Sequence, residues 1–215
     1  MTSIIVYDGS NTIGGNKIFM EENGKGVFLD FGMNFKKYNY YFQEYLKERS
    51  SRGIYDLIHL DLIPKLNIYR KELIPPDLDV SGYPSLKIDA VLISHAHMDH
   101  FGNIGLLNTD LPIIASPQTL ALIKGISDTG RLSMSLEVAF FSKKNAGKSD
   151  KTIKSVSGTY EMRSMVCTEP FTSDFESFMS TDLKSAADRS TGNLKALSCK
   201  GFEVERHQGS DVALI

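Results

Sequence analysis

The chain has 215 residues, of which 41% are hydrophobic and 23% are charged. This composition excludes a chain that is disordered throughout, and the length predicts one domain, or two small ones at most. The formal net charge of -2 lacks the general basic excess that would by itself indicate a nucleic-acid partner.

Cysteine content and hydropathy predict a soluble protein of the reducing cytoplasm. The two cysteines, Cys167 and Cys199, cannot form a disulfide framework and are not spaced as a paired metal motif. The first residues do not resemble a signal peptide, and no apolar run approaches the length of about 18 residues that a membrane span needs. We therefore expect no membrane association.

The N-terminal third predicts three short strands, over residues 4–7, 17–20 and 26–29. Asn23-Gly24 between the last two is the favoured pair for a type I′ hairpin turn, in which both central residues need φ > 0. Asp30 stands at the C-terminal end of the third strand.

Beyond the hairpin, helical periodicity over Tyr38–Arg49 predicts an amphipathic helix. The proline-rich stretch 54–84 predicts short helices and loops. Near the C-terminus, residues 175–186 are expected to be helical and residues 201–207 to form an exposed strand.

The middle of the chain alternates strand and helix, so we expect an α/β fold. The apolar runs 88–93 and 111–115 predict strands buried on both faces. Ser116-Pro117 predicts the cap and first residue of a helix. The Ser-, Lys- and Gly-rich segment 142–158 predicts an exposed loop, and we place a soft domain boundary there.

Three of the five histidines of the chain fall within six residues, next to an aspartate. These residues are His95, His97, Asp99 and His100. Imidazole and carboxylate are ligands of zinc and similar metals. His95 and His97 are two apart, so extended backbone projects them to the same side, where they can hold one metal together; Asp99 and His100 can serve a second. The alternative is a solvated polar loop ahead of a helix.

This run meets in full the H-x-H-x-D-H motif of the metallo-β-lactamase superfamily, which the sequence therefore resembles. Residues 9–16, 28–32 and 93–105 resemble more narrowly the ribonuclease J group of β-CASP nucleases. The resemblance covers roughly residues 1–126. It implies an αββα sandwich within the α/β (α+β) class and a centre of two Zn²⁺ ions.

The resemblance also implies roles for single residues. His95 and His97 would bind one metal, Asp99 and His100 the other, and Asp99 would also be catalytic. Asp30 matches an acidic position that helps to hold the histidine loop; the alternative is a turn former at the strand end. A zinc-bound hydroxide would then hydrolyse RNA phosphodiesters.

The C-terminal part departs from the family pattern, which needs further ligands after the motif. His207 is the last histidine, and it is either a third ligand or an exposed strand-end residue; Asp211 is a weaker candidate for a bridging ligand. A catalytic zinc takes three protein ligands plus water, so we expect one zinc or fewer. Residues 1–215 would then form a single partial metallo-β-lactamase domain, incomplete at its C-terminus, that is truncated or one piece of a split protein.

Three other features have simpler interpretations. His59 is expected to be a packed or surface histidine of a short helix. The glycine-rich segment 9–15 lacks the G-K-[S/T] ending of a phosphate loop, so a tight turn near the metal edge is the better interpretation. A solvated loop is preferred over phosphate contacts for five lysines, which are Lys143, Lys144, Lys148, Lys151 and Lys154.

Three hypotheses for function therefore stand. The preferred one is a ribonuclease J-like nuclease acting on RNA. The second is another hydrolase of the same fold, cleaving a thioester, lactone or β-lactam. The third is a catalytically incomplete metal-binding fragment that is completed by a partner chain or by forming a homo-oligomer.

Overall fold

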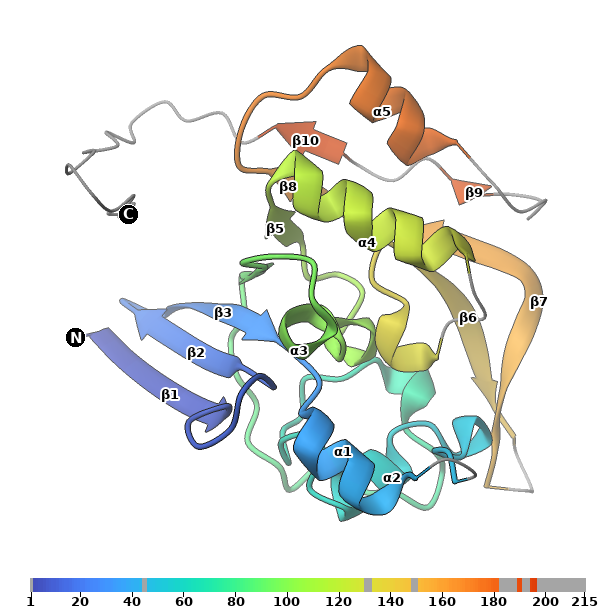
Figure 1. Cartoon of the computed structure of the whole chain (residues 1–215). Helices are drawn as coiled ribbons and strands as arrows, with labels where there is room; N and C mark the ends of the chain where they lie inside the picture. Colours follow the sequence, from blue (N-terminus) through green and yellow to red (C-terminus); the bar gives the residue numbers. More distant parts are fainter. Residues whose placement is uncertain are drawn as a thin grey trace.

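The structure is a computed structural model that describes residues 2–43, 46–129, 133–147, 151–181, 189–190 and 194–196. Its fold is mixed α/β, as predicted, with a mixed seven-stranded sheet and a smaller three-stranded sheet (Figure 1), and it is consistent with a metallo-β-lactamase-like fold. None of the helices in this described part has the length and apolar character needed to span a bilayer.

The large sheet has the strand order β1-β2-β3-β4-β5-β8-β10. Its first three strands are antiparallel, whereas β3 and the later strands run parallel. The strand bounds are β1 Thr2–Asp8, β2 Lys17–Glu22, β3 Lys25–Phe31, β4 Ala90–Leu92, β5 Ile113–Ala115, β8 Met165–Cys167 and β10 Leu194–Ala196.

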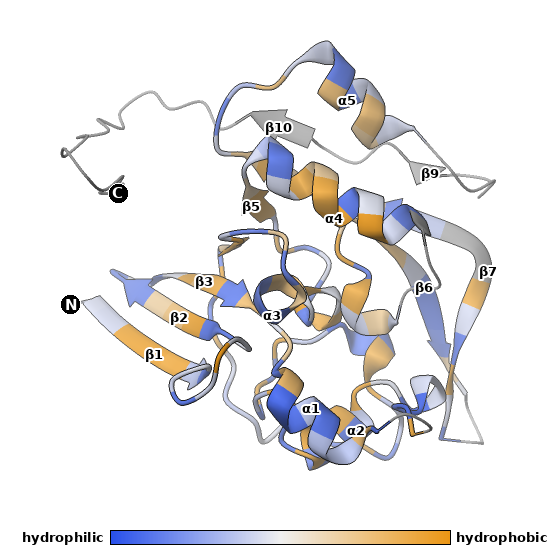
Figure 2. Ribbon diagram, viewed as in Figure 1, coloured by the Kyte–Doolittle hydropathy of each residue, from blue (hydrophilic) through white to orange (hydrophobic). Residues whose placement is uncertain are grey.

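The N-terminal hairpin confirms the sequence prediction. Asn23 and Gly24 both have positive φ, at 51° and 74°, as a type I′ turn requires. The buried rings of Phe19, Phe28 and Phe31 follow one another across β2 and β3, with centroid distances of 5.2 and 5.1 Å. At the sheet edge, β1 leaves an apolar middle exposed (Figure 2).

The parallel part also agrees with the prediction. β4 lies between β3 and β5 and is mostly buried. α4 follows β5, and the hydroxyl of Ser116 accepts a hydrogen bond from the backbone N–H of Thr119 at 3.2 Å, as an N-cap should. The helix bounds are α1 Phe35–Tyr41, η1 Ser50–Arg52, α2 Tyr55–His59, η2 Lys71–Leu73, α3 Met98–Phe101, η3 Ile104–Leu106, α4 Pro117–Thr129, η4 Met134–Leu136 and α5 Ser173–Ser180.

The helix predicted over Tyr38–Arg49 is wrong in both bounds. α1 begins at Phe35, because the side chain of Asn34 accepts a hydrogen bond from the N–H of Lys37 and so caps the helix. It ends at Tyr41, and described residues 46–49 are not helical. The Arg49 guanidinium instead binds the carboxylate of Asp56, which is one contact that holds the chain there in another conformation.

The exposed loop predicted over residues 142–158 is also wrong. That stretch contributes to the antiparallel strands β6 (Phe140–Ala146) and β7 (Ile153–Met162), which together with β9 (Arg189–Ser190) make up the small sheet. The physical reason is that Lys144 is buried and paired with Glu137, at 2.7 Å. Whether residues 1–215 form a single domain stays a prediction.

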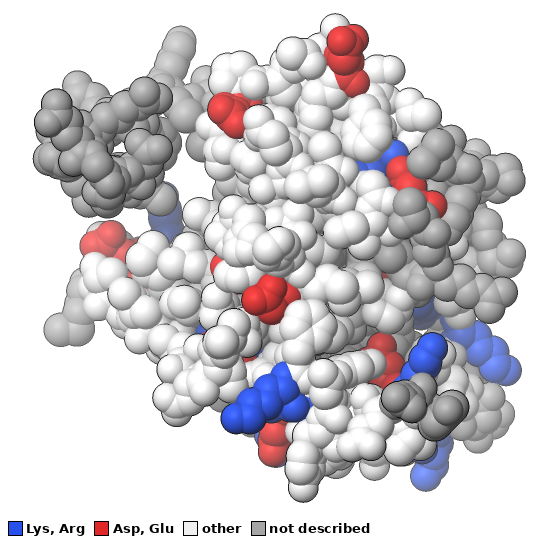
Figure 3. Space-filling view, viewed as in Figure 1, with Lys and Arg blue, Asp and Glu red and all other residues white. Residues whose placement is uncertain are grey.

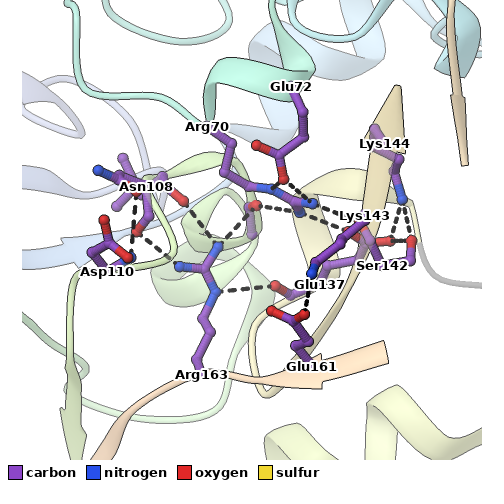
Figure 4. A network of polar contacts seen from close by, with 12 residues as sticks. Arg70, Glu72, Asn108, Asp110, Glu137, Ser142, Lys143, Lys144, Glu161 and Arg163 are labelled. Atoms are coloured by element: carbon purple, nitrogen blue, oxygen red, sulfur yellow. Dashed lines mark hydrogen bonds and ion pairs between the residues drawn. The ribbon is translucent and has the colours of Figure 1, made fainter. Parts of the chain in front are cut away.

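A buried polar network joins this hairpin to the loops of the large sheet (Figure 4). Arg70 binds the carboxylate of Glu137 at 2.7 Å and the carbonyl of Ser142 at 2.8 Å. Arg163 donates to three backbone carbonyls that follow α3, those of Gly105, Leu107 and Asn108. Burial, together with the neighbouring charge of Arg70, lowers the pKa of the Arg163 guanidinium.

Two C-terminal predictions fall partly or wholly beyond the described ranges. α5 spans Ser173–Ser180, so the predicted helix over 175–186 is present in its first part. The expected strand over 201–207 lies outside the residues that the structure describes.

Candidate metal centre

The histidine segment connects the C-terminal end of β4 to α3. β4 ends at Leu92, His97 stands in the N-cap position of α3, and His100 lies within that short helix. The neighbouring strand β3 ends at Phe31. The segment therefore lies where two parallel strands terminate side by side, which is where open α/β sheets hold their functional groups.

The four predicted side chains converge as two pairs. Nε2 of His95 lies 3.1 Å from Nδ1 of His97, and Nε2 of His100 lies 3.5 Å from Oδ2 of Asp99. Two ligands on one tetrahedral zinc lie roughly 3.3–3.6 Å apart, since each bond is about 2.0–2.2 Å. The rings of His95 and His100 are 3.9 Å apart between centroids, so the two pairs are neighbours.

Each pair of donor atoms could therefore hold one divalent cation from two sides. Imidazole nitrogens with one carboxylate oxygen are the chemistry that zinc and similar borderline metals prefer. The His97 side chain faces solvent, which keeps one side of the segment accessible. In the described part of the chain, however, no three or more His, Cys, Asp or Glu side chains are grouped so that they could hold one metal ion.

Asp30 lies directly behind this segment. Its Oδ1 accepts a hydrogen bond from the backbone N–H of Ser94 at 2.8 Å, and its Oδ2 lies 2.7 Å from Nδ1 of His100. The backbone of Asp30 has a φ of 59°, a left-handed conformation that Asp tolerates better than most residues. Its carboxylate can thus orient the His100 ring with Nε2 toward Asp99.

Sequence reasoning missed Ser94. Its hydroxyl donates to Oδ2 of Asp30 at 2.8 Å and lies 3.0 Å from Nδ1 of His95 and 3.1 Å from Nδ1 of His100. Ser94 therefore contacts one histidine from each pair. The available signal was its position, between the end of the buried strand and the first histidine.

The glycine-rich segment packs against the metal edge, as its interpretation as a tight turn predicted. The N–H of Gly15 donates to the carbonyl of Asp99 at 2.9 Å. A Cβ on Gly14 would lie 2.5 Å from Oδ2 of Asp99, and a Cβ on Gly32 would lie 1.6 Å from the Asp99 carbonyl. The missing side chains let Gly14 approach the carboxylate of Asp99 and Gly32 approach its backbone carbonyl.

A buried ion pair supports the same turn. The Lys17 ammonium lies 3.5 Å from Oδ2 of Asp8 and donates to the carbonyl of Gly15 at 3.3 Å. Burial lowers the pKa of Lys17 to about 8, although the charge of Asp8 opposes that shift. Despite the cost of its own burial, the pKa of Asp8 is lowered by Lys17 and by hydrogen bonds from Lys37 and Asn34.

The remaining candidates are separate from this centre or are not described. His59 is exposed on α2, stacks on Tyr55 and has Nδ1 2.8 Å from the Tyr55 carbonyl, in agreement with a surface histidine. His207 and Asp211 lie outside the described residues, as does Lys148. Lys144 is buried against Glu137 and is not solvated, whereas Lys143 and Lys151 stay exposed although they pair with Glu161 and Asp77.

Residues 64–114 match the model of the metallo-beta-lactamase superfamily. The resemblance to that superfamily is confirmed. The matched segment includes the metallo-β-lactamase-like run from His95 to His100 together with β4.

Two ribonuclease J proteins are similar to this chain. That of Pyrococcus abyssi is 28% identical over 127 residues, which are 58% of this chain and 24% of the relative. That of Methanocaldococcus jannaschii is 26% identical, over 56% of this chain and 24% of the relative. The chain thus spans about a quarter of the length of these curated relatives.

A solved structure of a protein of unknown function from Enterococcus faecalis V583 is 26% identical, with a TM-score of 0.43. The similar region covers 57% of this chain and 27% of the Enterococcus faecalis protein.

Proposed function

We propose that this chain provides the metal-binding part of a hydrolase that cleaves RNA phosphodiesters. The observation that carries the proposal is the convergence of two ligand pairs, His95 with His97 at 3.1 Å and Asp99 with His100 at 3.5 Å. Two ligands of one tetrahedral zinc are about 3.3–3.6 Å apart, so the second pair has this spacing and the first is slightly closer. The RNA substrate is proposed from the similarity to ribonuclease J. A cytoplasmic location is part of the same proposal.

A divalent cation held here would supply Lewis acidity, which lowers the pKa of a water molecule and balances charge that builds up on a phosphate. The protein groups have separate tasks. Asp30 and Ser94 hold the imidazoles from behind, through His100 Nδ1 and His95 Nδ1. Asp99, whose carboxylate is partly exposed, would act both as ligand and as the catalytic carboxylate facing the substrate.

A second candidate is a metal-binding fragment that needs ligands from a partner chain or a second copy. It is favoured by the grouping of donors in twos, since the described residues contain no set of three. A catalytic zinc takes three protein ligands. A third candidate, hydrolysis of a thioester or lactone by the same centre, differs only in the substrate.

Zinc stoichiometry and cleavage together test these proposals. Native mass spectrometry of the zinc-loaded chain should show one zinc or fewer, and His97→Ala should lose it, whereas His59→Ala should retain it because His59 lies on α2, outside the centre. RNA and thioester substrates are then assayed in parallel, with and without cell extract. Two tightly held zinc ions with unaided RNA cleavage would refute the incomplete centre, and thioester cleavage alone would refute the nuclease.

A further inference from the structure

α1 carries an unusual surface for a seven-residue helix. Three of its aromatic side chains are exposed: Phe35 by 40%, Tyr40 by 77% and Tyr41 by 40%. Two lysines, Lys36 and Lys37, lie among them and are also exposed. We call these five residues the α1 platform.

The exposed aromatic rings are not explained by packing in the core. No residue of α1 is buried, and Tyr38, with its ring 4.9 Å from that of Phe42, is the α1 residue that packs against the described core. The rings of Tyr40 and Tyr41 contact each other edge to face, with centroids 5.0 Å apart. Their outward faces are therefore available to another planar group.

The α1 platform lies next to the candidate metal centre. The N–H of Met33 donates to the carbonyl of Met98 at 3.0 Å, and Gly32 lies against the backbone of Asp99. Only three peptide steps lead from Gly32 to Phe35, a span of about 10 Å at most. Figure 3 shows basic atoms over the start of α1 and acidic atoms over α3 on the same face.

The lysines of the platform differ in their neighbours. Lys37 is held by the carboxylate of Asp8 at 3.1 Å, so part of its charge is balanced. Within the described ranges no carboxylate pairs with Lys36. A free ammonium between exposed aromatic rings is the combination by which proteins bind single-stranded nucleic acid, since the cation meets the phosphate and the rings stack on bases.

We propose that the α1 platform binds single-stranded RNA and leads it to the metal centre. The inference rests on the proposed function for the choice of RNA. Single strands are required because stacking needs base faces that a duplex keeps covered. Tyr40, the most exposed ring, stacks on a base, and Lys36 contacts a backbone phosphate.

The test measures binding separately from cleavage. A 5′-fluorescein-labelled oligouridine is titrated with the zinc-free 215-residue chain, and fluorescence anisotropy reports the affinity. Tyr40→Ala should weaken binding by roughly fivefold or more, whereas Tyr40→Phe should bind as the wild type, because it keeps the ring. Lys36→Glu should weaken binding and reduce its dependence on salt.

Lys25→Glu is the matched charge control. Lys25 is exposed at the start of β3, at the opposite end of that strand from Asp30, and its replacement changes the net charge by the same amount. It should leave the affinity within about twofold, since a diffuse surface charge contributes less than a phosphate contact. Circular dichroism of each variant confirms that the surface substitutions leave the fold intact.

Several results would overturn the proposal. These are equal affinity of Tyr40→Ala and wild type, an equal effect of Lys36→Glu and Lys25→Glu, or binding of an RNA duplex as tight as that of the single strand. Loss of binding to phosphatidylserine vesicles in these variants, with RNA binding unchanged, would assign the platform to a membrane surface instead. The failure of the nuclease proposal is distinguishable: the chain would then bind RNA through α1 and cut none.

Discussion

The Oδ2 atom of Asp30 lies 2.7 Å from Nδ1 of His100, although 70 positions separate the two residues in sequence. This contact joins the end of β3 to the histidine segment and leaves Nε2 of His100 facing Asp99 at 3.5 Å. A carboxylate behind a histidine in this way fixes the orientation of the ring.

Asp30→Asn should weaken zinc binding by roughly 10- to 100-fold, because an amide neither stabilises the His100 ring as a carboxylate does nor accepts both Ser94 hydrogen bonds equally well. Competition with a chromophoric chelator measures the affinity. The control is Asp89→Asn, in which a carboxylate that binds the backbone N–H of Gly26 at 3.0 Å is changed away from the centre. Equal losses in both variants would contradict a specific role for Asp30.

Gly32→Ala should displace the histidine segment. The added Cβ would lie 1.6 Å from the carbonyl of Asp99, and backbone cannot move aside as a side chain can. We expect the free energy of unfolding to fall by about 3 kcal/mol, which is the upper part of the usual range for overpacking, and zinc binding to be lost. Urea unfolding and the chelator assay measure the two effects.

The matched glycine is Gly125, within α4, where an added Cβ would meet nothing within 4 Å. Gly125→Ala should raise the free energy of unfolding by about 0.5–1 kcal/mol, because glycine loses more conformational entropy in a helix. If both substitutions changed stability in the same direction, the close approach at Gly32 would not explain the first result.

Asp8→Asn should destabilise the protein at pH 7 by about 2 kcal/mol. The value is below the roughly 3–5 kcal/mol for a fully buried pair, since Asp8 keeps some exposure and Lys17 alone is completely enclosed. The variant leaves the Lys17 ammonium buried beside an uncharged amide.

That destabilisation should shrink as pH rises. The folded-state pKa of Lys17 is about 8, below its ordinary value of 10.5, so the unfolded chain binds more protons between these values. In the wild type the cost of burying the Lys17 ammonium is fully present below pH 8, and it is relieved above pH 8 as the lysine loses its proton. The variant lacks the Asp8 charge that favours the ammonium, so its lysine loses the proton more readily and its stability recovers more as pH rises. Urea unfolding at pH 7 and pH 9 checks this, and a penalty that grew with pH would refute it.

Arg163→Met should lower the free energy of unfolding by more than about 3 kcal/mol. The substitution leaves the carbonyls of Leu107 and Asn108 without their guanidinium donor, while the Gly105 carbonyl keeps only Arg70. An unmet buried acceptor costs about 1–3 kcal/mol. Arg49→Met is the control, since that guanidinium is exposed and pairs with Asp56 at the surface. Thermal unfolding should separate the two variants clearly.

Features set by neighbouring residues could be predicted. The Asn23-Gly24 turn depends on the φ angles of two residues, and the Ser116 cap depends on a hydrogen bond over three positions. The convergence of His95 with His97 needed only the end of a strand and a spacing of two. Each of these depends on contacts within a few residues of the chain.

Features that depend on residues far away in the sequence could not be predicted. The segment 142–158 has the composition of a loop, yet it contributes to β6 and β7 because Arg70 and Glu137 satisfy its polar groups. The α1 helix stops early although its apolar periodicity continues. Composition does not report which charge will be paired, because the partner can lie anywhere in the chain.

The amino-acid sequence alone determined which residues are the candidate metal-binding donors and which strand precedes them, because the six-residue motif and the apolar run before it are both local patterns. The tertiary structure alone decided what surrounds those donors: Asp30 and Ser94 contact the imidazoles, the glycine loops lie against Asp99, and the segment that leads into α1 contacts Met98. The physical reason is that hydrogen bonds and close backbone approaches depend on distances in space. The spacing of residues along the sequence does not specify these distances.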